Sequence, residues 1–442
     1  MFEVREKADK VQKAMLVSLC FEDSAVAEQK AMLDELEDLV SNLDIEIVGK
    51  HLVRSREMHA KFLCGTGKAE EVHQLAINCD ADCVVFDNML APSQQREWER
   101  LVDMNVIDRE EVILDIFAKR AKTKEATLQV ELARMQYSIP RMTRMWRHLD
   151  RQGGGSGGGK GGGATARGEG ETQIEVDRRL ARSRIESIQK EIDGVCRQRA
   201  TQRKERARQL LPTAAIVGYT NAGKSSLLTF ISGAEIMAKD MLFATLDTTT
   251  RKIELPDGQP LLLTDTVGFI RNLPHRLVEA FKSTLEEAVI ADFLIQVVDA
   301  SDSEAWRHYE TTLDVLDELG AKGKPMVVVL NKMDRLSDEE QIAVYERLQE
   351  QMTGIVIPMS VKKEIGMENL LQACSQMLAK RVRKNYYRIP LASSHLIAAM
   401  HRDGKVLSTE YEDNDAIVEA ILPVSSHHKM EQYIYIVPSP QQ

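Results

Sequence analysis

Short apolar runs alternate with amphipathic stretches over the first 120 residues. Within the amphipathic stretches, apolar residues recur three and four apart, which is the spacing of a helix that buries one face. The alternation of strands with helices predicts a small α/β domain with a mostly parallel sheet, over residues 1–122. Strands are predicted at 14–21, 45–48, 83–86 and 106–107, and helices at 25–41, 67–78, 92–101 and 110–120.

Residues 123–210 follow a different pattern. Apolar positions lie three or four apart along two long stretches, 128–149 and 174–195. This spacing predicts two long helices that share an apolar seam as an antiparallel hairpin. Pro140 lies within the first stretch and is expected to kink that helix, because proline lacks the N–H that a helix needs.

The segment between the two predicted helices, residues 152–170, contains 11 of the 25 glycines of the chain. Such a segment cannot pack a core, and ordering it costs about 1–2 kcal/mol per residue in backbone entropy. We expect it to be mobile in the free protein. A turn between helices needs only about 2–8 residues, so the length favours binding over a passive connection. The candidate contacts are basic residues in or beside this segment: Arg144, Arg147, Arg151, Lys160 and Arg167.

The distribution of charge points to a polyanionic partner for the same region. The net charge of −10 taken alone argues against a nucleic-acid partner. Residues 119–209, however, hold 22 lysines and arginines against 11 aspartates and glutamates, a local charge of +11 that leaves −21 on the rest of the chain. Such segregation favours one basic element that meets a polyanion. A solvated helical surface is the alternative.

The length of 442 residues predicts three or four domains. No apolar run approaches the roughly 20 residues that span a bilayer, and the charged first residues carry no signal-peptide core. We therefore expect a cytoplasmic protein, monomeric when free. The six cysteines are scattered. Cys79 and Cys83 form the one close pair, and without further ligands nearby we interpret them as free thiols rather than a zinc site.

The third region, residues 211–382, opens with an apolar run that leads into the pattern G-x-x-x-x-G-K-S. Its glycines let several backbone N–H groups point at one phosphate, and the helix that follows presents its positive end to the same anion. Lys224 is predicted to reach the β- and γ-phosphates, and Ser225 to ligate Mg²⁺. A chance match is the alternative, but the strand before and the helix after are as the motif requires. The loop consists of Gly218, Tyr219, Thr220, Asn221, Ala222, Gly223, Lys224 and Ser225.

Two further segments have the character of nucleotide switches. A threonine in the first can give its hydroxyl to Mg²⁺ and its N–H to the γ-phosphate, but the residues alone do not choose among Thr245 and the three at 248–250. In the second, a buried strand ends in D-x-x-G; Asp265 is predicted to hold Mg²⁺ through water, and the Gly268 N–H to bind the γ-phosphate. The predicted contacts are Phe243, Ala244, Thr245, Leu246 and Asp247, then Asp265, Thr266, Val267 and Gly268.

The base-recognition pattern N-K-x-D follows a third apolar strand. A carboxylate at Asp334 can accept hydrogen bonds from two guanine nitrogens, whereas adenine offers neither donor there and would leave the carboxylate unpaired. Asn331 is expected to brace the loop, and a later loop to supply a backbone N–H to guanine O6. GTP rather than ATP is the predicted ligand. The two loops are Asn331, Lys332, Met333 and Asp334, and Ser360, Val361 and Lys362.

Phe269 occupies the position after D-x-x-G where many small GTPases place a glutamine that orients water. A phenyl ring cannot hydrogen-bond water, so we expect slow intrinsic hydrolysis unless another group or a partner supplies the missing polarity. The last region, residues 383–442, predicts a small α+β module with strands at 387–390, 405–410 and 417–422.

With these motifs in view, the chain resembles the HflX family of translation-associated GTPases. The resemblance covers about residues 1–380 and rests on motifs within and outside the nucleotide domain. It agrees with the fold predicted from the pattern, a P-loop GTPase domain with an N-terminal α/β domain and a helical hairpin carrying the Gly-rich loop, whereas the small C-terminal α+β module is predicted from the pattern alone. The matching motifs are Gly218–Ser225, 243–247, Asp265–Ile270, 273–275, Asn331–Asp334, Val106–Arg109, Ile113–Ala118, Leu128–Leu132 and Gly168–Gln173.

The resemblance also implies roles. Thr245 becomes the switch ligand of Mg²⁺ beside Ser225, and Lys224, Thr245 and Gly268 the catalytic group. Asn221 resembles an asparagine with which related GTPases recruit K⁺, which would offset the missing glutamine at Phe269. Family members bind the large ribosomal subunit and are implicated in splitting or rescuing stalled ribosomes, with the Gly-rich loop inserted toward the peptidyl-transferase centre. The loop here is longer than the family pattern.

The sequence therefore predicts a GTPase that binds rRNA of the large ribosomal subunit through residues 123–210 and cycles between GTP and GDP. Two other classes remain open. One is a signalling switch whose basic hairpin binds a protein. The other is an ATP-driven RNA remodeller that uses the N-terminal domain, although that domain has no complete phosphate loop, and its Gly65-Thr-Gly-Lys68 is better explained as a structural turn.

Overall fold

The computed structural model describes residues 11–22, 26–144, 165–208, 211–233, 242–243, 245–274, 277, 282–379, 382–423, 426–427 and 430–435. The chain forms two compact units. The first comprises residues 1–195, 241–243 and 273–281, and the second comprises 196–240, 244–272 and 282–442. Within the described residues, no helix combines the length and the apolar character needed to span a membrane.

The first unit contains a four-stranded parallel sheet in the order β2-β1-β3-β4. This confirms the α/β fold that the alternating pattern predicted. Trp98 lies fully buried in its core, 5.2 Å from the ring of Phe62 and 4.7 Å from that of Phe86. The strands are β1 (Lys13–Cys20), β2 (Glu46–Arg54), β3 (Cys83–Phe86) and β4 (Asn105–Asp108); the helices between and after them are α1 (Val26–Ser41), α2 (Thr66–Asn78), α3 (Pro92–Val102) and α4 (Arg109–Arg120).

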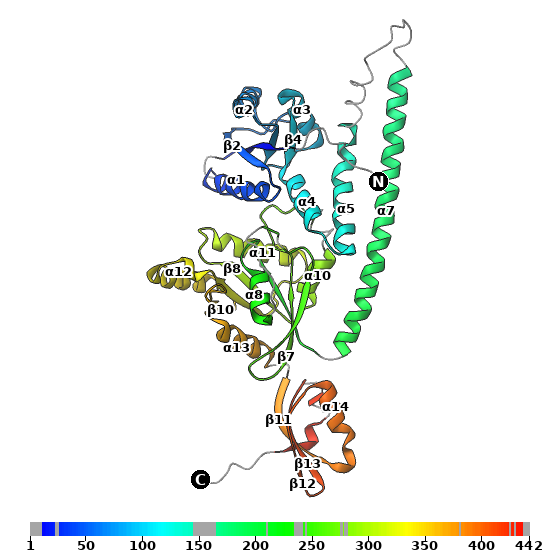
Figure 1. Cartoon of the computed structure of the whole chain (residues 1–442), viewed down its shortest axis with the longest axis vertical. Coiled ribbons are helices and arrows are strands. Elements are labelled where there is room, and N and C mark those ends of the chain that lie inside the picture. The colour runs from blue at the N-terminus through cyan, green and yellow to red at the C-terminus, as the bar shows by residue number, and fades with distance from the viewer. Residues whose placement is uncertain are drawn as a thin grey trace. The chain divides into compact units, whose positions relative to one another are not determined.

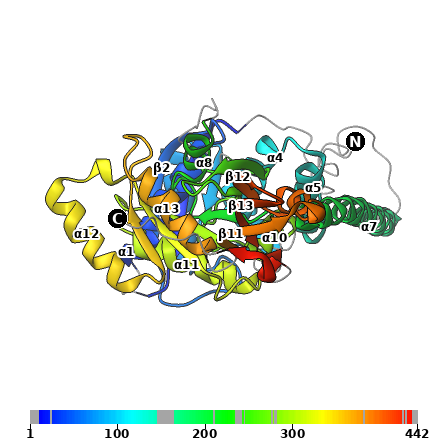
Figure 2. The same ribbon diagram turned by 90° about the horizontal axis from the view of Figure 1, so that it is seen from below.

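Two helices follow. Helix α5 (Lys124–Ser138) ends two residues before Pro140 and continues as the 3-10 turn Ile139–Arg144. Helix α7 (Thr165–Arg208) runs unbroken for 44 residues (Figures 1 and 2). It starts inside the segment predicted as a Gly-rich loop, so residues 165–170 are helical and that part of the loop prediction is wrong. Glycines 168 and 170 each disfavour the helix by only about 1 kcal/mol relative to alanine, so two of them do not prevent a helix from extending over this stretch.

The predicted apolar seam is observed between α5 and α7. Leu128 and Leu132 of α5 and Ile188 of α7 form one buried cluster. An ion pair joins Glu131 to Arg184 at 2.8 Å, and a second joins Lys124 to Glu191 at 3.7 Å. Because the partner on α7 moves toward the N-terminus as the residue on α5 moves toward the C-terminus, the two helices are antiparallel along this seam.

The second unit is built on a six-stranded sheet in the order β10-β9-β8-β5-β7-β6. All neighbours are parallel except β6 and β7. The strands are β5 (Thr213–Gly218), β6 (Thr249–Glu254), β7 (Pro260–Asp265), β8 (Phe293–Asp299), β9 (Met326–Asn331) and β10 (Ile355–Pro358). The helices are α8 (Lys224–Ser232), α10 (Lys282–Ile290), α11 (Ala305–Glu318), α12 (Asp338–Gln351) and α13 (Met367–Leu378).

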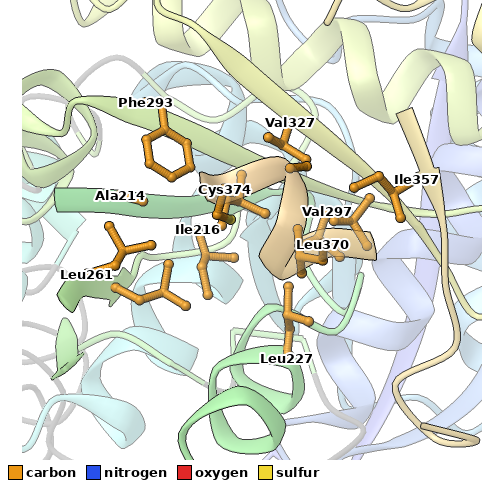
Figure 3. Close-up of a cluster of buried hydrophobic side chains, with 14 of the residues drawn as sticks. Ala214, Ile216, Leu227, Leu261, Phe293, Val297, Val327, Ile357, Leu370 and Cys374 are labelled. Atoms are coloured by element: carbon orange, nitrogen blue, oxygen red, sulfur yellow. The ribbon is translucent and has the colours of Figure 1, made fainter. Parts of the chain in front are cut away.

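The central strands of this sheet are continuous apolar runs, because helices cover both of their faces. On one face, Leu227 of α8 and Leu370 of α13 meet Ile216 and Val297 (Figure 3). On the other, Tyr309 of α11 belongs to a second cluster that contains Val298 of β8 and Val328 of β9. This two-sided core holds the strand ends, and with them the loops that follow, in fixed positions.

The C-terminal part of the second unit has an antiparallel sheet in the order β12-β13-β11-β14. The sequence pattern did not predict the helix α14, whose Met400 is fully buried against the sheet. Its signal was available, since Leu396, Ile397 and Met400 are three and four apart. The elements are β11 (Val382–Pro390), α14 (His395–Asp403), β12 (Lys405–Glu412), β13 (Asp415–Pro423) and β14 (Ile434–Tyr435).

Candidate nucleotide-binding and hydrolysis site

Four motif-bearing loops leave the same edge of the six-stranded sheet. The G-x-x-x-x-G-K-S loop follows β5, the D-x-x-G segment follows β7, N-K-x-D follows β9, and the 360–362 loop follows β10. These four strands are parallel members of one sheet, so their carboxyl ends meet at one edge, which is where ligands bind in such folds. The structure therefore gathers residues as far apart in the sequence as Gly218 and Lys362, which are 144 positions apart.

The two glycines of the phosphate loop occupy positions that no other residue fits. Gly218 has φ +144°, and a Cβ there would lie 2.2 Å from the carbonyl oxygen of Val297. Gly223 has φ +99°, and a Cβ there would lie 2.3 Å from Nδ2 of Asn331. The first glycine allows close packing of the loop on β8, and the second allows the base-recognition loop to approach the start of α8.

Lys224 is buried and turns back onto the loop. Its ammonium donates to the carbonyl oxygens of Gly218 at 3.0 Å and Tyr219 at 2.6 Å. Burial lowers the pKa of Lys224 to about 8, and Asp265 partly offsets this. The ammonium is thus held beside the backbone that the motif assigns to the phosphates, where a polyanionic ligand would favour its charged form.

Three oxygen-bearing side chains converge beside the loop. The hydroxyl of Ser225 lies 2.5 Å from that of Thr245 and donates to Asp265 at 2.7 Å. Burial raises the pKa of the Asp265 carboxyl, while Lys224 and Ser225 act in the opposite direction. The second oxygen of Asp265, Oδ1, is buried and accepts no hydrogen bond from the part of the chain that the structure describes.

This set of hard oxygen donors with an unsatisfied carboxylate oxygen fits Mg²⁺. Ser225 and Thr245 would bind the ion directly, and Asp265 would bind it through a water molecule. Mg²⁺ bound here supplies positive charge to the phosphates of the nucleotide. Among the four candidate threonines of the switch segment, Thr245 is the one that this geometry brings to Ser225.

The base-recognition loop is braced from both sides. Asn331 is buried, donates to the carbonyl oxygen of Ala222 at 2.8 Å, and accepts from the Val361 N–H at 3.2 Å. It therefore connects the phosphate loop to the 360–362 loop. The Ser360 hydroxyl donates to Asp334 at 2.6 Å and is the main cause of the lowered pKa of that carboxyl. The carboxylate that the motif assigns to guanine thus stays ionised.

One contact of this loop was not predicted. The ammonium of Lys332 forms an ion pair of 2.8 Å with Asp299, the last residue of β8. Lys332 adopts φ +63° at the turn, and the ion pair holds its alkyl stem in one direction. The apolar run that ends in an aspartate was visible in the sequence, but nothing there linked Asp299 to Lys332.

Substitution of Asn331 by alanine tests the brace. It leaves a buried carbonyl of the phosphate loop and a partly buried N–H of Val361 without their partner, and an unsatisfied buried group costs about 1–3 kcal/mol. We expect GDP and GTP to bind at least tenfold more weakly, as measured by displacement of a fluorescent guanine nucleotide. Asn385→Ala is the control, because it removes a side-chain hydrogen bond to His427 in the C-terminal part. Equal affinities of the two variants would contradict the bracing role.

Phe269 and Phe243 are both buried. Phe269 is 1% exposed and its N–H donates to the Gly218 carbonyl at 3.1 Å. Phe243 packs edge-on against Phe117 of α4 within the first unit, with ring centroids 4.7 Å apart. The side chain of Phe243, which the motif placed in the nucleotide site, therefore belongs to this packing.

The remaining predicted residues are only partly described. Leu246, Thr266 and Val267 are buried, Asp247 is partly exposed, and Lys362 is exposed. Ala244, Arg147, Arg151 and Lys160 lie outside the described residues. Arg144 ends the 3-10 turn and Arg167 lies in the first turns of α7, and for both the backbone alone is described.

Family models described as GTP-binding GTPase N-terminal, GTP-binding GTPase Middle Region and 50S ribosome-binding GTPase match residues 30–118, 120–206 and 213–332. The chain is 72% identical to GTPase HflX of Akkermansia muciniphila, over 98% of this chain and 99% of that protein. It is 39% identical to GTPase HflX of Escherichia coli, over 93% of each.

A solved structure of a GTP-binding protein from Sulfolobus solfataricus in complex with GDP covers 84% of this chain and 99% of its own, at 24% identity and a TM-score of 0.42. The fold and the four loops define a P-loop GTPase. Near-complete coverage at 72% identity settles which one: the chain belongs to the HflX family of GTPases.

Proposed function

We propose that this GTPase binds the large ribosomal subunit, contacts its rRNA through the basic region 123–210, and splits or rescues stalled ribosomes. The observation that carries the proposal is the local charge of +11 on residues 119–209 of a chain whose other residues sum to −21. The match to the family model described as 50S ribosome-binding GTPase supports it independently.

The α5–α7 pair suits an extended contact surface. Its seam buries few residues, and most described side chains of α7 are exposed or partly exposed. Twelve of the 44 residues of α7 are arginine or lysine. A helix pair held by a narrow apolar seam keeps the rest of its surface available for phosphates. Residues 152–164 of the Gly-rich segment lie outside the described residues; we propose that this segment contacts rRNA, because glycine allows close backbone approach to phosphate and sugar.

The nucleotide site would control this binding. The Mg²⁺ ligands Ser225 and Thr245 and the Gly268 N–H would hold both switch segments while GTP is bound, and hydrolysis would release them. Because Phe269 has no hydrogen-bonding group, we propose that the intrinsic rate is low and rises on the ribosome. Asn221, exposed and at φ +59°, is the proposed position of a K⁺ ion that adds polarity to the site. The protein would act in the cytoplasm and be monomeric when free.

Sedimentation with purified ribosomal subunits tests the proposal. With a non-hydrolysable GTP analogue the protein should travel with the large subunit, and with GDP it should stay near the top of the gradient. Binding should weaken steeply with salt, because contacts to phosphates release counterions. A salt-independent interaction with a protein fraction would instead support a signalling switch.

Deletion of residues 153–163 tests the Gly-rich segment. We expect ribosome splitting to fall about tenfold or more, while GTP hydrolysis without ribosomes stays unchanged, because the deleted residues are remote in sequence from every nucleotide motif. Lys160→Ser separates the two contributions of this segment, since it removes the charge of a candidate contact and keeps the length. Full splitting activity of the deletion variant would contradict a role for the segment.

A further inference from the structure

Tyr219, the second residue of the phosphate loop, has a side chain that the nucleotide motif does not account for. It is buried, and its ring stacks on that of His308 in α11, with centroids 3.8 Å apart and planes 13° from parallel. Its hydroxyl accepts the backbone N–H of Arg271 at 2.9 Å. One side chain thus connects the phosphate loop, α11 and the segment that follows D-x-x-G.

Two backbone hydrogen bonds reinforce this connection. The N–H of Thr220 donates to the carbonyl of Phe269 at 2.8 Å, and the N–H of Phe269 donates to the carbonyl of Gly218 at 3.1 Å. Tyr219 and Phe269 therefore form a short parallel bridge. Together with the tyrosine hydroxyl, these bonds hold the chain after Gly268 at Phe269 and at Arg271.

Gly268 itself is enclosed between the elements that this bridge brings together. A Cβ at this position would lie 2.9 Å from Nζ of Lys224 and 3.0 Å from Cα of Thr220. The Gly268 backbone is therefore adjacent to the lysine that the motif assigns to the phosphates. A small shift of the segment after Gly268 would move its N–H relative to Lys224.

Helix α11 fixes the direction of the tyrosine. His308 is buried and lies 3.7 Å from Asp302, and the neighbouring Tyr309 and Thr312 are buried in the same helix. Glu304, which precedes the helix, lies 3.4 Å from Nη1 of Arg271. Tyr219 thus contacts α11, and Arg271 contacts the residue that precedes this helix.

We propose that Tyr219 is a positioning residue for GTP hydrolysis. Its hydroxyl holds the segment from Gly268 to Arg271 against the phosphate loop, so that the Gly268 N–H faces the γ-phosphate. The proposal rests on the assignment of that N–H to the γ-phosphate and is independent of ribosome binding. Because GDP has no γ-phosphate, the hydroxyl affects binding of GTP and its hydrolysis, and leaves GDP binding unchanged.

Tyr219→Phe in the full chain tests this, because it removes the hydroxyl and keeps the ring on His308. We expect kcat for GTP hydrolysis to fall about fivefold, the loss of one ordinary hydrogen bond. The Kd of a non-hydrolysable GTP analogue should rise by a similar factor relative to the Kd of GDP. Both measurements are made without ribosomes, so the fate of the ribosome proposal does not affect them.

Tyr309→Phe is the matched control. Tyr309 is also buried, and it follows His308 in α11. Its hydroxyl likewise accepts a backbone N–H, that of Thr353 at 3.1 Å. The two variants should have equal melting temperatures, and Tyr309→Phe should keep the wild-type kcat. Equal kcat values for the two variants would overturn the proposal. So would equal weakening of GDP and GTP-analogue binding by Tyr219→Phe, because that result describes general damage to the phosphate loop.

Discussion

Substitution of Asp334 by asparagine is expected to raise the Kd for GTP about 10²–10³-fold and to abolish the preference for guanine over other bases. The carboxylate is predicted to accept from two guanine nitrogens, and hydrogen bonds to charged groups are worth about 1.5–3 kcal/mol each. An asparagine amide presents a donor where an acceptor is needed. The measurement is displacement of a fluorescent guanine nucleotide by GTP, ATP and XTP.

The structure adds a control for this experiment. Ser360 donates to Oδ1 of Asp334 at 2.6 Å, so Ser360→Ala loosens the carboxylate without changing its charge. That variant should lose affinity severalfold and keep its preference for guanine. A guanine preference that survives in the asparagine variant would exclude Asp334 as the group that recognises the base.

Substitution of Phe269 by glutamine should destabilise the GTPase unit by about 3 kcal/mol without raising the rate of hydrolysis. The position is the one where other GTPases orient water with glutamine, so the sequence alone suggests that the change would restore activity. In the structure the side chain at this position is 1% exposed, and a glutamine there would bury a polar amide, which costs free energy unless the amide finds hydrogen-bond partners. We expect the melting temperature to fall by about 10 °C.

Phe269→Leu is the control, because it keeps the position apolar and should cost only about 1 kcal/mol. Hydrolysis of GTP is measured for both variants below their melting temperatures, with and without K⁺. An accelerated glutamine variant of normal stability would show that the side chain at this position reaches the nucleotide, contrary to the buried placement.

Most of the fold and the chemistry of the site follow from local pattern. The strands around 83–86 and 326–331 are continuous apolar runs because they are covered on both faces, and such runs are legible without tertiary information. Gly218, Gly223 and Lys224 are required by the phosphate loop itself. The base preference was predicted from Asp334, which lies three residues after Asn331 in the same motif. Each of these signals depends on neighbours in the chain.

Other features depend on partners remote in sequence. Thr245 was distinguished from the threonines after it by its contact with Ser225, and Asp299 was linked to the site by its ion pair with Lys332.

The sequence by itself determined that this chain has a parallel α/β unit, a guanine-binding P-loop unit and a basic helical region between them, because period, motif and charge are properties of consecutive residues. Tertiary structure alone decided which side chains meet. It buried Phe269, turned Tyr219 onto His308 and brought its hydroxyl to Arg271. The reason is physical: which atoms lie within hydrogen-bonding distance is set by how the strands and helices pack, and that information is spread over the whole chain.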